Sequence, residues 1–329
     1  MSLYVEISKQ LSHFKLEVAF FSDQESTALF GISGSGKSMI LKCIAGIETP
    51  DAGKIILNGK VLFDSAKKIN LPPQKREVGY LFQNYALFPH LTVRQNIMIA
   101  SKSDEAKMKE LLKQFNLTQF ENQLPNQLSG GQQQRVAICR MLAMQPQLLL
   151  FDEPFSAIDT YLKDQLHLTM LELIKKVQKD VIIVTHDFKE AYSLCKKMVF
   201  IDKGQVLAND LISKLYYQPQ NKQLAKLFGY KNIVDVKDNI ILDWSYHLKK
   251  PICATKLIIP NNAFKLTQNN NQTISFNSYE VISDFKETEV IFKTDFKDIW
   301  VTFTNENWQK WVNRDFYLTI DEDKIIVLK

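Results

Sequence analysis

The chain has 329 residues, of which 45% are hydrophobic, and its 41 lysines and arginines exceed its 36 aspartates and glutamates to give a net charge of +5. This length predicts two domains, and the mild, dispersed charge lacks the basic stripe of a nucleic-acid-binding surface, so we expect no nucleic-acid partner. No apolar run approaches the roughly 20 residues of a membrane span, and the four cysteines lack metal-ligand spacing. We therefore expect a soluble, reduced, cytoplasmic protein.

The first predicted elements are two half-buried strands at residues 3–7 and 16–20, where apolar and polar side chains alternate. Phe14 lies in the turn between them. An aromatic ring there could stack on a nucleotide base, but an ordinary packed or half-exposed phenylalanine fits the pattern equally well. Both interpretations stay open at this point.

A phosphate-binding loop is predicted at residues 31–38, which read Gly-Ile-Ser-Gly-Ser-Gly-Lys-Ser and match G-x-x-x-x-G-K-[S/T] at every fixed position. An apolar strand precedes the loop and a helical pattern follows it, so the helix N-terminus can face the phosphates. Lys37 can reach the β- and γ-phosphates, and the Ser38 hydroxyl can bind Mg²⁺. The candidate nucleotide ligands of this loop are Gly31, Ser33, Gly34, Ser35, Gly36, Lys37 and Ser38.

Between residues 78 and 146 the pattern changes from a short strand to a helical block. The strand 78–82 ends at Gln83, and the segment 84–92, rich in aromatic residues, leads into helical periodicity from Val93 onwards. This pattern indicates a helical insertion, spanning about residues 84–146, in an α/β core.

A second anion site is predicted where residues 128–132 read Leu-Ser-Gly-Gly-Gln at the start of a helix. Ser129, Gly130, Gly131 and Gln132 can leave backbone N–H groups exposed at the helix N-terminus, which favours an anion. The same residues could also be a serine-capped helix start with no ligand. Their distance along the chain from the phosphate loop indicates a separate phosphate contact.

Two buried apolar strands carry further predicted chemistry at their carboxyl ends, which is where parallel sheets bind ligands. Residues 148–154 predict a buried strand that ends in the carboxylates Asp152 and Glu153, and residues 181–185 predict a second buried strand that terminates at His186. Asp152 can hold Mg²⁺, Glu153 can polarise an attacking water, and His186 can contact the γ-phosphate of a nucleotide. Ser-Ala-Ile-Asp follows the first of these strands at residues 156–159.

The composition changes at about residue 235, because all four tryptophans lie beyond that point and all eleven glycines lie before it. We expect a second domain over residues 235–329 that is built from short strands, with asparagine and aspartate in its turns and a short helix within 305–313. The predicted strands are 240–244, 252–259, 279–283, 289–293, 299–304, 316–320 and 325–328.

Six motifs occur in the order found in ATP-binding cassette (ABC) transporter ATPases, which the chain resembles over residues 1–230. The motifs are residues 31–38, Gln83, 128–132, 148–153, 156–159 and His186. The resemblance implies an α/β P-loop NTPase fold of the ABC type over residues 1–230, with the helical insertion. Residues 235–329 resemble the small, oligonucleotide-fold-like β-barrels (TOBE/Mop type) that are appended to importer ATPases.

The resemblance also implies how the site would work. In that family two chains pair head to tail, and each ATP lies between the phosphate loop of one chain and the serine-glycine helix start of the other. Lys37 and the loop amides would bind phosphate, while Ser38 and Gln83 would contact Mg²⁺ or the lytic water. Asp152 would support the metal, and Glu153 would be the general base. The implied cofactors are ATP and Mg²⁺.

The remaining implied roles concern the γ-phosphate, the partner chain and the base of the nucleotide. His186 would hold the γ-phosphate, Asp159 would communicate across the dimer, and residues 129–132 would act in trans on the partner's ATP. Phe14 matches the adenine-stacking aromatic of the family only loosely, because the segment before it is short.

The stretch 71–97 and the C-terminal extension are similar to those of bacterial importer ATPases, above all the molybdate type. The implied function is ATP hydrolysis that powers uptake of molybdate or a related oxyanion through integral-membrane permease subunits. An extracellular or periplasmic solute-binding protein would be an indirect partner, and the chain would lie peripherally on the inner face of the cell membrane. Uptake of ferric ion, sulfate, polyamine or sugar, and a soluble ABC ATPase outside transport, stay open as alternatives.

Overall fold

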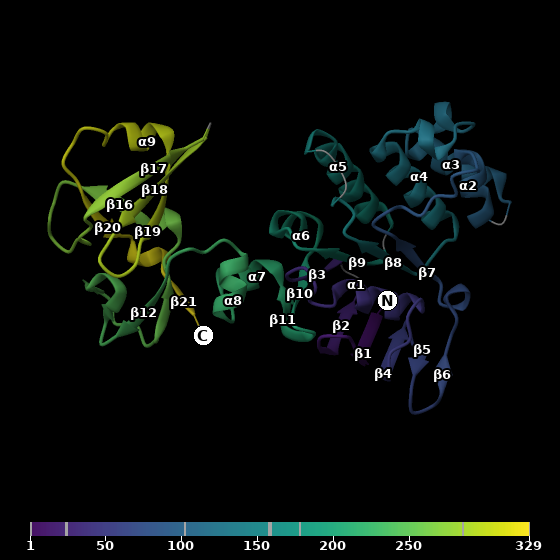
Figure 1. The fold of residues 1–329 in the computed structure, drawn as a ribbon, viewed down its shortest axis with the longest axis horizontal. Helices are drawn as coiled ribbons and strands as arrows, with labels where there is room; N and C mark the ends of the chain where they lie inside the picture. Colours follow the sequence, from purple (N-terminus) through teal and green to yellow (C-terminus); the bar gives the residue numbers. More distant parts are fainter. Residues whose placement is uncertain are drawn as a thin grey trace. The chain divides into compact units, whose positions relative to one another are not determined.

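The computed structural model describes residues 2–23, 26–101, 103–156, 160–177, 179–284 and 286–328. Contacts within the chain divide it into two compact units, Met1–Ser213 and Lys214–Lys329 (Figure 1). The domain boundary expected between residues 230 and 235 stays a prediction. No helix in the described ranges is long and apolar enough to cross a membrane.

The first unit is built on a single sheet, in which the described residues form 11 strands in the order β6-β5-β4-β1-β2-β11-β10-β3-β9-β8-β7. The strands are β1 (Ser2–Gln10), β2 (Lys15–Asp23), β3 (Ser26–Phe30), β4 (Ala52–Leu57), β5 (Lys60–Asp64), β6 (Ile69–Asn70), β7 (Val78–Leu81), β8 (Leu148–Asp152), β9 (Asp180–Thr185), β10 (Lys197–Asp202) and β11 (Gln205–Leu211). The N-terminal strands predicted at 3–7 and 16–20 are therefore confirmed, and they belong to the same sheet as the phosphate-loop strand.

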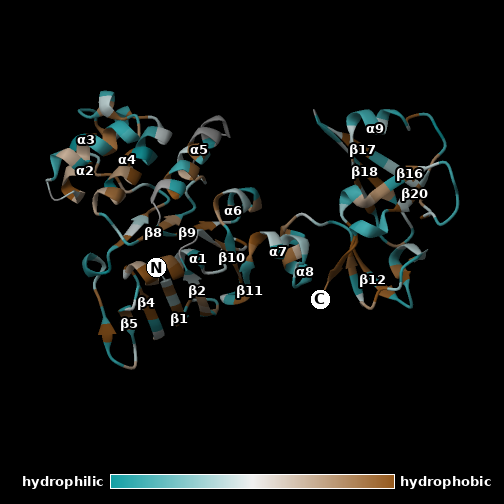
Figure 2. Ribbon diagram, turned by 180° about the vertical axis from the view of Figure 1, so that it is seen from behind, coloured by the Kyte–Doolittle hydropathy of each residue, from teal (hydrophilic) through white to brown (hydrophobic). Residues whose placement is uncertain are grey.

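The strands β10, β3, β9, β8 and β7 run parallel to one another, whereas β6, β5, β4, β1 and β2 pair antiparallel. Between these two groups, β11 pairs antiparallel with β10 and parallel with β2. Every residue of β3, β8 and β9 is buried, which confirms the prediction that these continuous apolar runs are covered on both faces. The segments labelled β8 and β9 include ribbon in the brown of hydrophobic residues (Figure 2). Because the strands are parallel, the residues that follow Phe30, Asp152 and Thr185 meet at one edge of the sheet.

Helices α2 (Val93–Ala100), α3 (Glu105–Gln114) and α4 (Gly130–Ala143) lie between β7 and β8 in the chain and group together, as the predicted helical insertion requires (Figure 1). The other helices of this unit are α1 (Lys37–Ala45), α5 (Thr160–Val177) and α6 (Phe188–Leu194). Capping boxes start two of the three inserted helices: Thr92 with Gln95 at α2, and Ser129 with Gln132 at α4.

Arg76 is a fully buried arginine that caps the C-terminal end of α1. Its Nη1 donates to the carbonyl oxygens of Cys43 at 2.8 Å and Ile44 at 2.9 Å. Its Nε donates to the Leu71 carbonyl and its Nη2 to Asn70 Oδ1, both at 2.7 Å. Burial lowers the pKa of Arg76, because the charged guanidinium loses its contact with water. The four acceptors replace that hydration. The side chain therefore fastens α1, and with it the phosphate loop, to the segment before β7.

We expect Arg76→Met to lower the free energy of unfolding by about 2–4 kcal/mol, because the buried carbonyls at the end of α1 would lose their donors. Urea denaturation, followed by the far-ultraviolet circular dichroism of the backbone, measures this change. Lys75→Met is the matched control, since it removes a neighbouring lysine that is exposed. Equal denaturation midpoints for the two variants would contradict the capping role of Arg76.

The second unit contains short antiparallel sheets with the strand orders β14-β13-β12-β15-β21, β16-β20 and β17-β18-β19. Its elements, with α7 crossing from the first unit, are α7 (Ile212–Tyr217), α8 (Lys222–Leu227), β12 (Ile233–Lys237), β13 (Ile240–Ile241), β14 (Tyr246–His247), β15 (Lys256–Ile258), β16 (Phe264–Thr267), β17 (Ser278–Ser283), β18 (Glu287–Lys293), β19 (Ile299–Thr304), α9 (Asn305–Gln309), β20 (Tyr317–Ile320) and β21 (Ile326–Leu328). The predicted class of an α/β core followed by a small all-β region is confirmed.

Some details of the second unit differ from the prediction. The strand expected at 240–244 stops at Ile241, and Leu242–Trp244 forms a 3₁₀ turn, which brings the Trp244 Nε1 within 2.9 Å of the Lys297 carbonyl. Asp238 and Asn239 hold left-handed backbone with φ of 50° and 63°, as expected for a region without glycine, but Ser245 does so too with φ of 51°.

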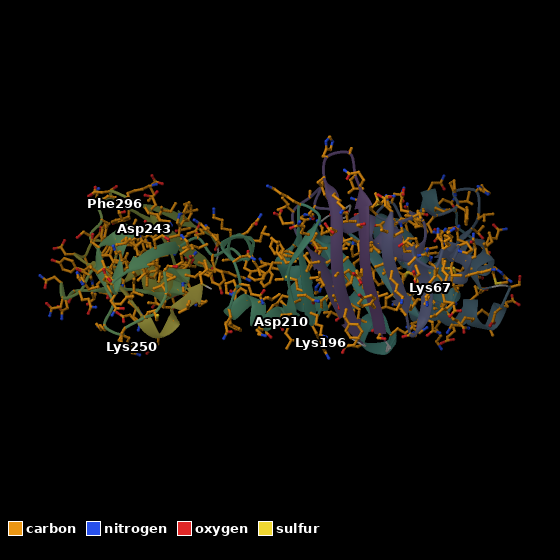
Figure 3. The ribbon with its side chains drawn as sticks, turned by 90° about the horizontal axis from the view of Figure 1, so that it is seen from below. Lys67, Lys196, Asp210, Asp243, Lys250 and Phe296 are labelled. Atoms are coloured by element: carbon orange, nitrogen blue, oxygen red, sulfur yellow. The ribbon has the colours of Figure 1, made fainter. Side chains whose placement is uncertain are left out.

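Charged side chains of both signs are spread over the surface of each unit. Lys67 and Lys196 mark the first unit and Asp243 and Lys250 the second (Figure 3). Lys250 pairs with Asp323 at 2.5 Å. This mixed surface agrees with the dispersed charge of the sequence.

Candidate functional site

The phosphate loop connects β3 to α1, and at two of its glycines the surrounding atoms leave no room for a Cβ. Gly31 has φ of 156°, and a Cβ there would lie 2.1 Å from the Ile201 carbonyl oxygen. Gly36, the residue before α1, has φ of 102°, and a Cβ there would lie 2.9 Å from Leu16 Cδ1. The loop can therefore present its N–H groups together with the N-terminus of α1, which is the arrangement that binds phosphate.

Lys37 closes this loop from inside. Its side chain is buried, and its Nζ donates to the carbonyl oxygens of Gly31 at 2.9 Å and Ile32 at 2.7 Å. Burial lowers the pKa of Lys37, and the charges of Glu153 and Asp152 oppose that shift. The ammonium group is thus placed in the loop, near both predicted acidic residues of the site.

Asp152 joins the phosphate loop to the end of β8. The Ser38 hydroxyl donates to Asp152 Oδ1 at 2.7 Å, and the Tyr80 hydroxyl donates to Asp152 Oδ2 at 2.8 Å. The described residues contain no group of three or more His, Cys, Asp or Glu side chains that could hold a metal. A hydroxyl and a single carboxylate fit Mg²⁺, because this ion completes its shell with waters and phosphate oxygens.

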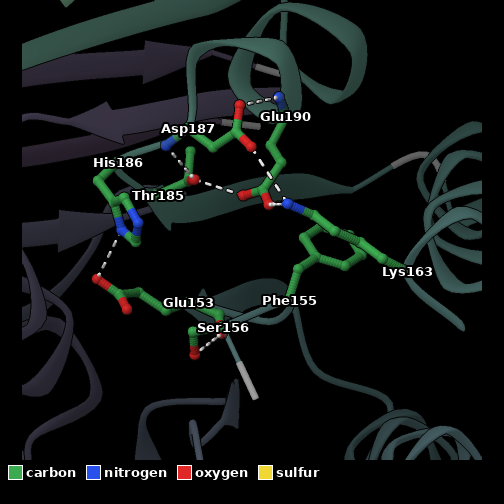
Figure 4. A pocket seen from close by; sticks show the side chains of 8 residues that line it. All are labelled: Glu153, Phe155, Ser156, Lys163, Thr185, His186, Asp187 and Glu190. Atoms are coloured by element: carbon green, nitrogen blue, oxygen red, sulfur yellow. Dashed lines mark hydrogen bonds and ion pairs between the residues drawn. The ribbon is translucent and has the colours of Figure 1, made fainter. Parts of the chain in front are cut away.

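Glu153 and His186 face one another at the ends of β8 and β9. His186 Nδ1 lies 3.5 Å from Glu153 Oε1 (Figure 4). Glu153 has left-handed backbone with φ of 46°, and its N–H donates to the Val184 carbonyl at 3.1 Å. That turn ends β8 directly after Asp152 and directs the chain across the end of the neighbouring strand.

A cavity of about 290 Å³ opens beside these two residues (Figure 4). Gln83 reaches the same place, because its Nε2 donates to Ser156 Oγ at 3.0 Å, and Ser156 Oγ in turn donates to the Glu153 carbonyl at 3.0 Å. The residues that line the cavity are Glu153, Phe155, Ser156, Lys163, Thr185, His186, Asp187 and Glu190.

Lys163 is a residue of this cavity that the sequence did not single out. Its Nζ lies 2.7 Å from Glu190 Oε1 and 3.2 Å from Asp187 Oδ2, and the Thr185 hydroxyl also donates to Glu190. Burial raises the pKa of Asp187, but its bonds from Lys163 and the backbone outweigh burial and hold that pKa below its usual value. This network fixes the chain on both sides of His186. No local pattern reveals it, because it joins two separate helices.

The helix start at Ser129 is built as an N-cap. Ser129 Oγ accepts from the Gln132 N–H at 3.4 Å, and Gln132 Oε1 accepts from the Ser129 N–H at 2.8 Å. Further along α4, the buried Gln134 donates from Nε2 to the Pro154 carbonyl at 2.6 Å. The helix that carries Ser129, Gly130 and Gly131 is therefore tied to the segment that follows Glu153.

The two remaining predicted residues have different outcomes. The Phe14 ring packs against the core of the sheet, and its Cε2 lies 3.5 Å from the position that a Cβ on Gly36 would take. The ring is therefore next to the phosphate loop and also partly buried, while stacking on a base stays a prediction. Asp159 lies outside the described residues.

Comparisons with known proteins agree with this geometry. Residues 18–156 match the family model described as "ABC transporter". A probable sulfate/thiosulfate import ATP-binding protein of Chlorella vulgaris is 40% identical over 245 residues, which cover 70% of this chain and 100% of that protein. The molybdate/tungstate import ATP-binding protein of Methanocaldococcus jannaschii is 42% identical, over 70% of this chain and 77% of that one.

A third relative and a solved structure are also similar to this chain. An Fe(3+) ions import ATP-binding protein of Haemophilus influenzae is 38% identical over 218 residues, which cover 64% of this chain and 62% of that protein. The dimeric structure of a post-hydrolysis state of an ATP-binding cassette, bound to ADP and Pi, has a TM-score of 0.54 at 27% identity. It covers 64% of this chain and 99% of the solved chain.

Proposed function

The chain belongs to the ABC transporter family, and from that premise we propose that it is the ATP-hydrolysing subunit of an importer that drives solute uptake through a separate membrane permease. ATP and Mg²⁺ are its cofactors. The observation that carries the proposal is the meeting of Lys37, Asp152, Glu153 and His186 at one edge of the parallel sheet. The import function is supported by the relatives, which are named as import ATP-binding proteins.

The site residues divide the work of hydrolysis among them. The loop amides and Lys37 would bind and orient the phosphates, and the Ser38 hydroxyl and the Asp152 carboxylate would hold the metal. When bound, Mg²⁺ would supply positive charge that offsets the charge of the phosphate oxygens. Glu153 orients the attacking water and accepts its proton at the carboxylate, and His186, 3.5 Å away, contacts the γ-phosphate. Gln83, linked to Ser156, faces the same space.

We propose that two chains pair head to tail, so that Ser129, Gly130, Gly131 and Gln132 of one chain complete the ATP site of the other. The support is that the Ser129 helix start offers free N–H groups at its first turn, and that the similar solved cassettes are dimeric. In this arrangement Asp159 communicates between the two sites.

The solute is proposed to be molybdate or a related oxyanion. Three of the relatives are named for import of the oxyanions sulfate/thiosulfate or molybdate/tungstate, while others are named for Fe(3+) and spermidine/putrescine. We further propose that the sheets of the second unit form the TOBE/Mop-like accessory barrel, over residues 235–329. The chain would act in the cytoplasm, peripherally on the inner face of the membrane, with a solute-binding protein as an indirect partner.

The permease contact is proposed at residues 84–92, which a buried asparagine shapes. Asn96 Oδ1 accepts from the Phe88 N–H at 3.0 Å, and Asn96 Nδ2 donates to the carbonyls of Phe88 at 3.1 Å and Leu91 at 2.9 Å. The Phe88 ring stays 41% exposed, with the Arg140 guanidinium 5.3 Å from its centroid. An exposed aromatic side chain on a backbone that is held in place is a suitable anchor for a partner.

Purification of the tagged chain from membranes of its native host tests this proposal. We expect an integral-membrane permease to be recovered with the chain, and Phe88→Asp to lower that recovery by about tenfold or more. Phe296→Asp is the matched control, because Phe296 is an exposed phenylalanine of the second unit. Failure to recover any membrane protein would contradict the importer function.

Thermal stabilisation of the associated binding protein by molybdate, Fe(3+) or spermidine would identify the solute.

A further inference from the structure

Tyr80 lies on β7, beside the strand that ends in Asp152. The two strands are parallel, and Tyr80 is opposite Leu150 in their register. Its hydroxyl is directed along β8 and donates to Asp152 Oδ2 at 2.8 Å. In this bond the phenol O–H is the donor and the carboxylate oxygen is the acceptor.

The hydroxyl of Tyr80 completes the hydrogen bonding of the Asp152 carboxylate inside the protein. Ser38 donates to Oδ1 and Tyr80 to Oδ2, so each oxygen has its own donor. A carboxylate held at only one oxygen can still turn about its Cβ–Cγ bond, whereas one held at both is fixed in plane and direction. The Tyr80 ring is itself restrained, because the Phe82 ring centroid lies 4.5 Å from its own.

We propose that Tyr80 is a positioning residue for the metal: its hydroxyl fixes the orientation of the Asp152 carboxylate, which together with the Ser38 hydroxyl would hold the divalent cation. This inference rests on the proposed ATPase function and adds a role for a residue outside the six motifs. Tyr80 does not touch the cation. It acts through Asp152, as partners of metal ligands commonly do.

The test measures metal affinity directly. Mn²⁺ binding to the full chain in the presence of ADP is followed by electron paramagnetic resonance, and binding of a fluorescent ADP is measured with EDTA. Tyr80→Phe keeps the ring and removes only the donor. We expect it to weaken Mn²⁺ binding by about 10-fold or more, while ADP binding in EDTA stays unchanged. The Mg²⁺ concentration that half-saturates hydrolysis should rise in parallel.

Tyr230→Phe is the matched control, because Tyr230 is also buried and its hydroxyl donates to the Tyr216 carbonyl at 3.0 Å. Both tyrosines belong to the second unit, whereas the phosphate loop belongs to the first. An unchanged Mn²⁺ affinity in Tyr80→Phe would overturn the inference. Equal weakening of ADP binding with and without metal would also overturn it, since that pattern indicates a structural role. Failure of the wild-type chain to bind ADP or Mn²⁺ would instead contradict the proposed function.

Discussion

Glu153→Gln is expected to retain ATP binding and to lose most hydrolysis, with turnover falling by about 10²- to 10⁴-fold, because an amide cannot accept the proton of the attacking water. The substitution keeps the size of the side chain and its position 3.5 Å from His186. The loop, Lys37 and Asp152 are untouched, so the affinity for nucleotide should be close to that of the wild-type chain. Phosphate release and binding of a fluorescent nucleotide measure the two quantities separately.

Glu77→Gln provides a closely matched control for this result. Glu77 is also a glutamate with left-handed backbone, at φ of 57°, but its exposed side chain pairs with Lys60. The Glu77→Gln variant should therefore hydrolyse ATP at the wild-type rate. If Glu153→Gln kept turnover within a few-fold of wild type, the assignment of Glu153 as general base would be wrong.

Two inactive variants are expected to restore activity when they are mixed, because each proposed ATP site is shared between two chains. Lys37→Met removes the ammonium of the phosphate loop, and Ser129→Arg places a bulky side chain at the start of α4. In a homodimer of either variant, neither of the two ATP sites is intact. In an equal mixture half of the dimers are mixed and each contains one intact site, so activity should reach about a quarter of the wild-type value if sites act independently.

Steady-state phosphate release, measured as the ratio of the two variants is varied, tests this expectation. Activity should pass through a maximum near equal amounts and return to background at either extreme. Circular dichroism should first show that both variants are folded, since loss of the Ser129 cap alone costs about 1 kcal/mol. A mixture no more active than the separate variants would contradict the head-to-tail arrangement.

The elements that form the edge of the site were predictable because their signals are local. A glycine-rich loop between an apolar run and a helical pattern can adopt few structures. Likewise, β8 ends at the first of the two carboxylates at which its strand was predicted to end, and β9 begins one residue before the predicted strand 181–185. Since both strands are parallel, their ends had to meet, and the structure brings Glu153 and His186 together as that argument requires.

The contacts that hold these residues in place were not predictable, because each joins positions far apart in the chain. Tyr80 and Asp152 are 72 residues apart, and Lys163 and Asp187 are 24 apart. Nothing in the pattern around Arg76 distinguishes it from a surface residue, although it is fully buried. Such pairings depend on strand register and helix packing, which a single sequence does not specify.

The second unit was the harder part for a related reason. Its strands are short, and four of the five residues of the segment 240–244 are apolar, which favours a strand. The strand ends at Ile241 because Trp244 instead donates to a carbonyl 53 residues further along the chain. In a sheet of short strands, one such tertiary bond outweighs the local preference.

The left-handed backbone at Glu153 decides which replacements there can be interpreted. A side chain at φ of 46° costs about 1 kcal/mol or more, and β-branched residues fit worst. In a library of all substitutions, valine and isoleucine would be depleted through poor folding, whereas glycine and asparagine would suit the turn whatever their chemistry. The residues tolerated at position 153 would therefore record the shape of the chain as well as the needs of proton transfer.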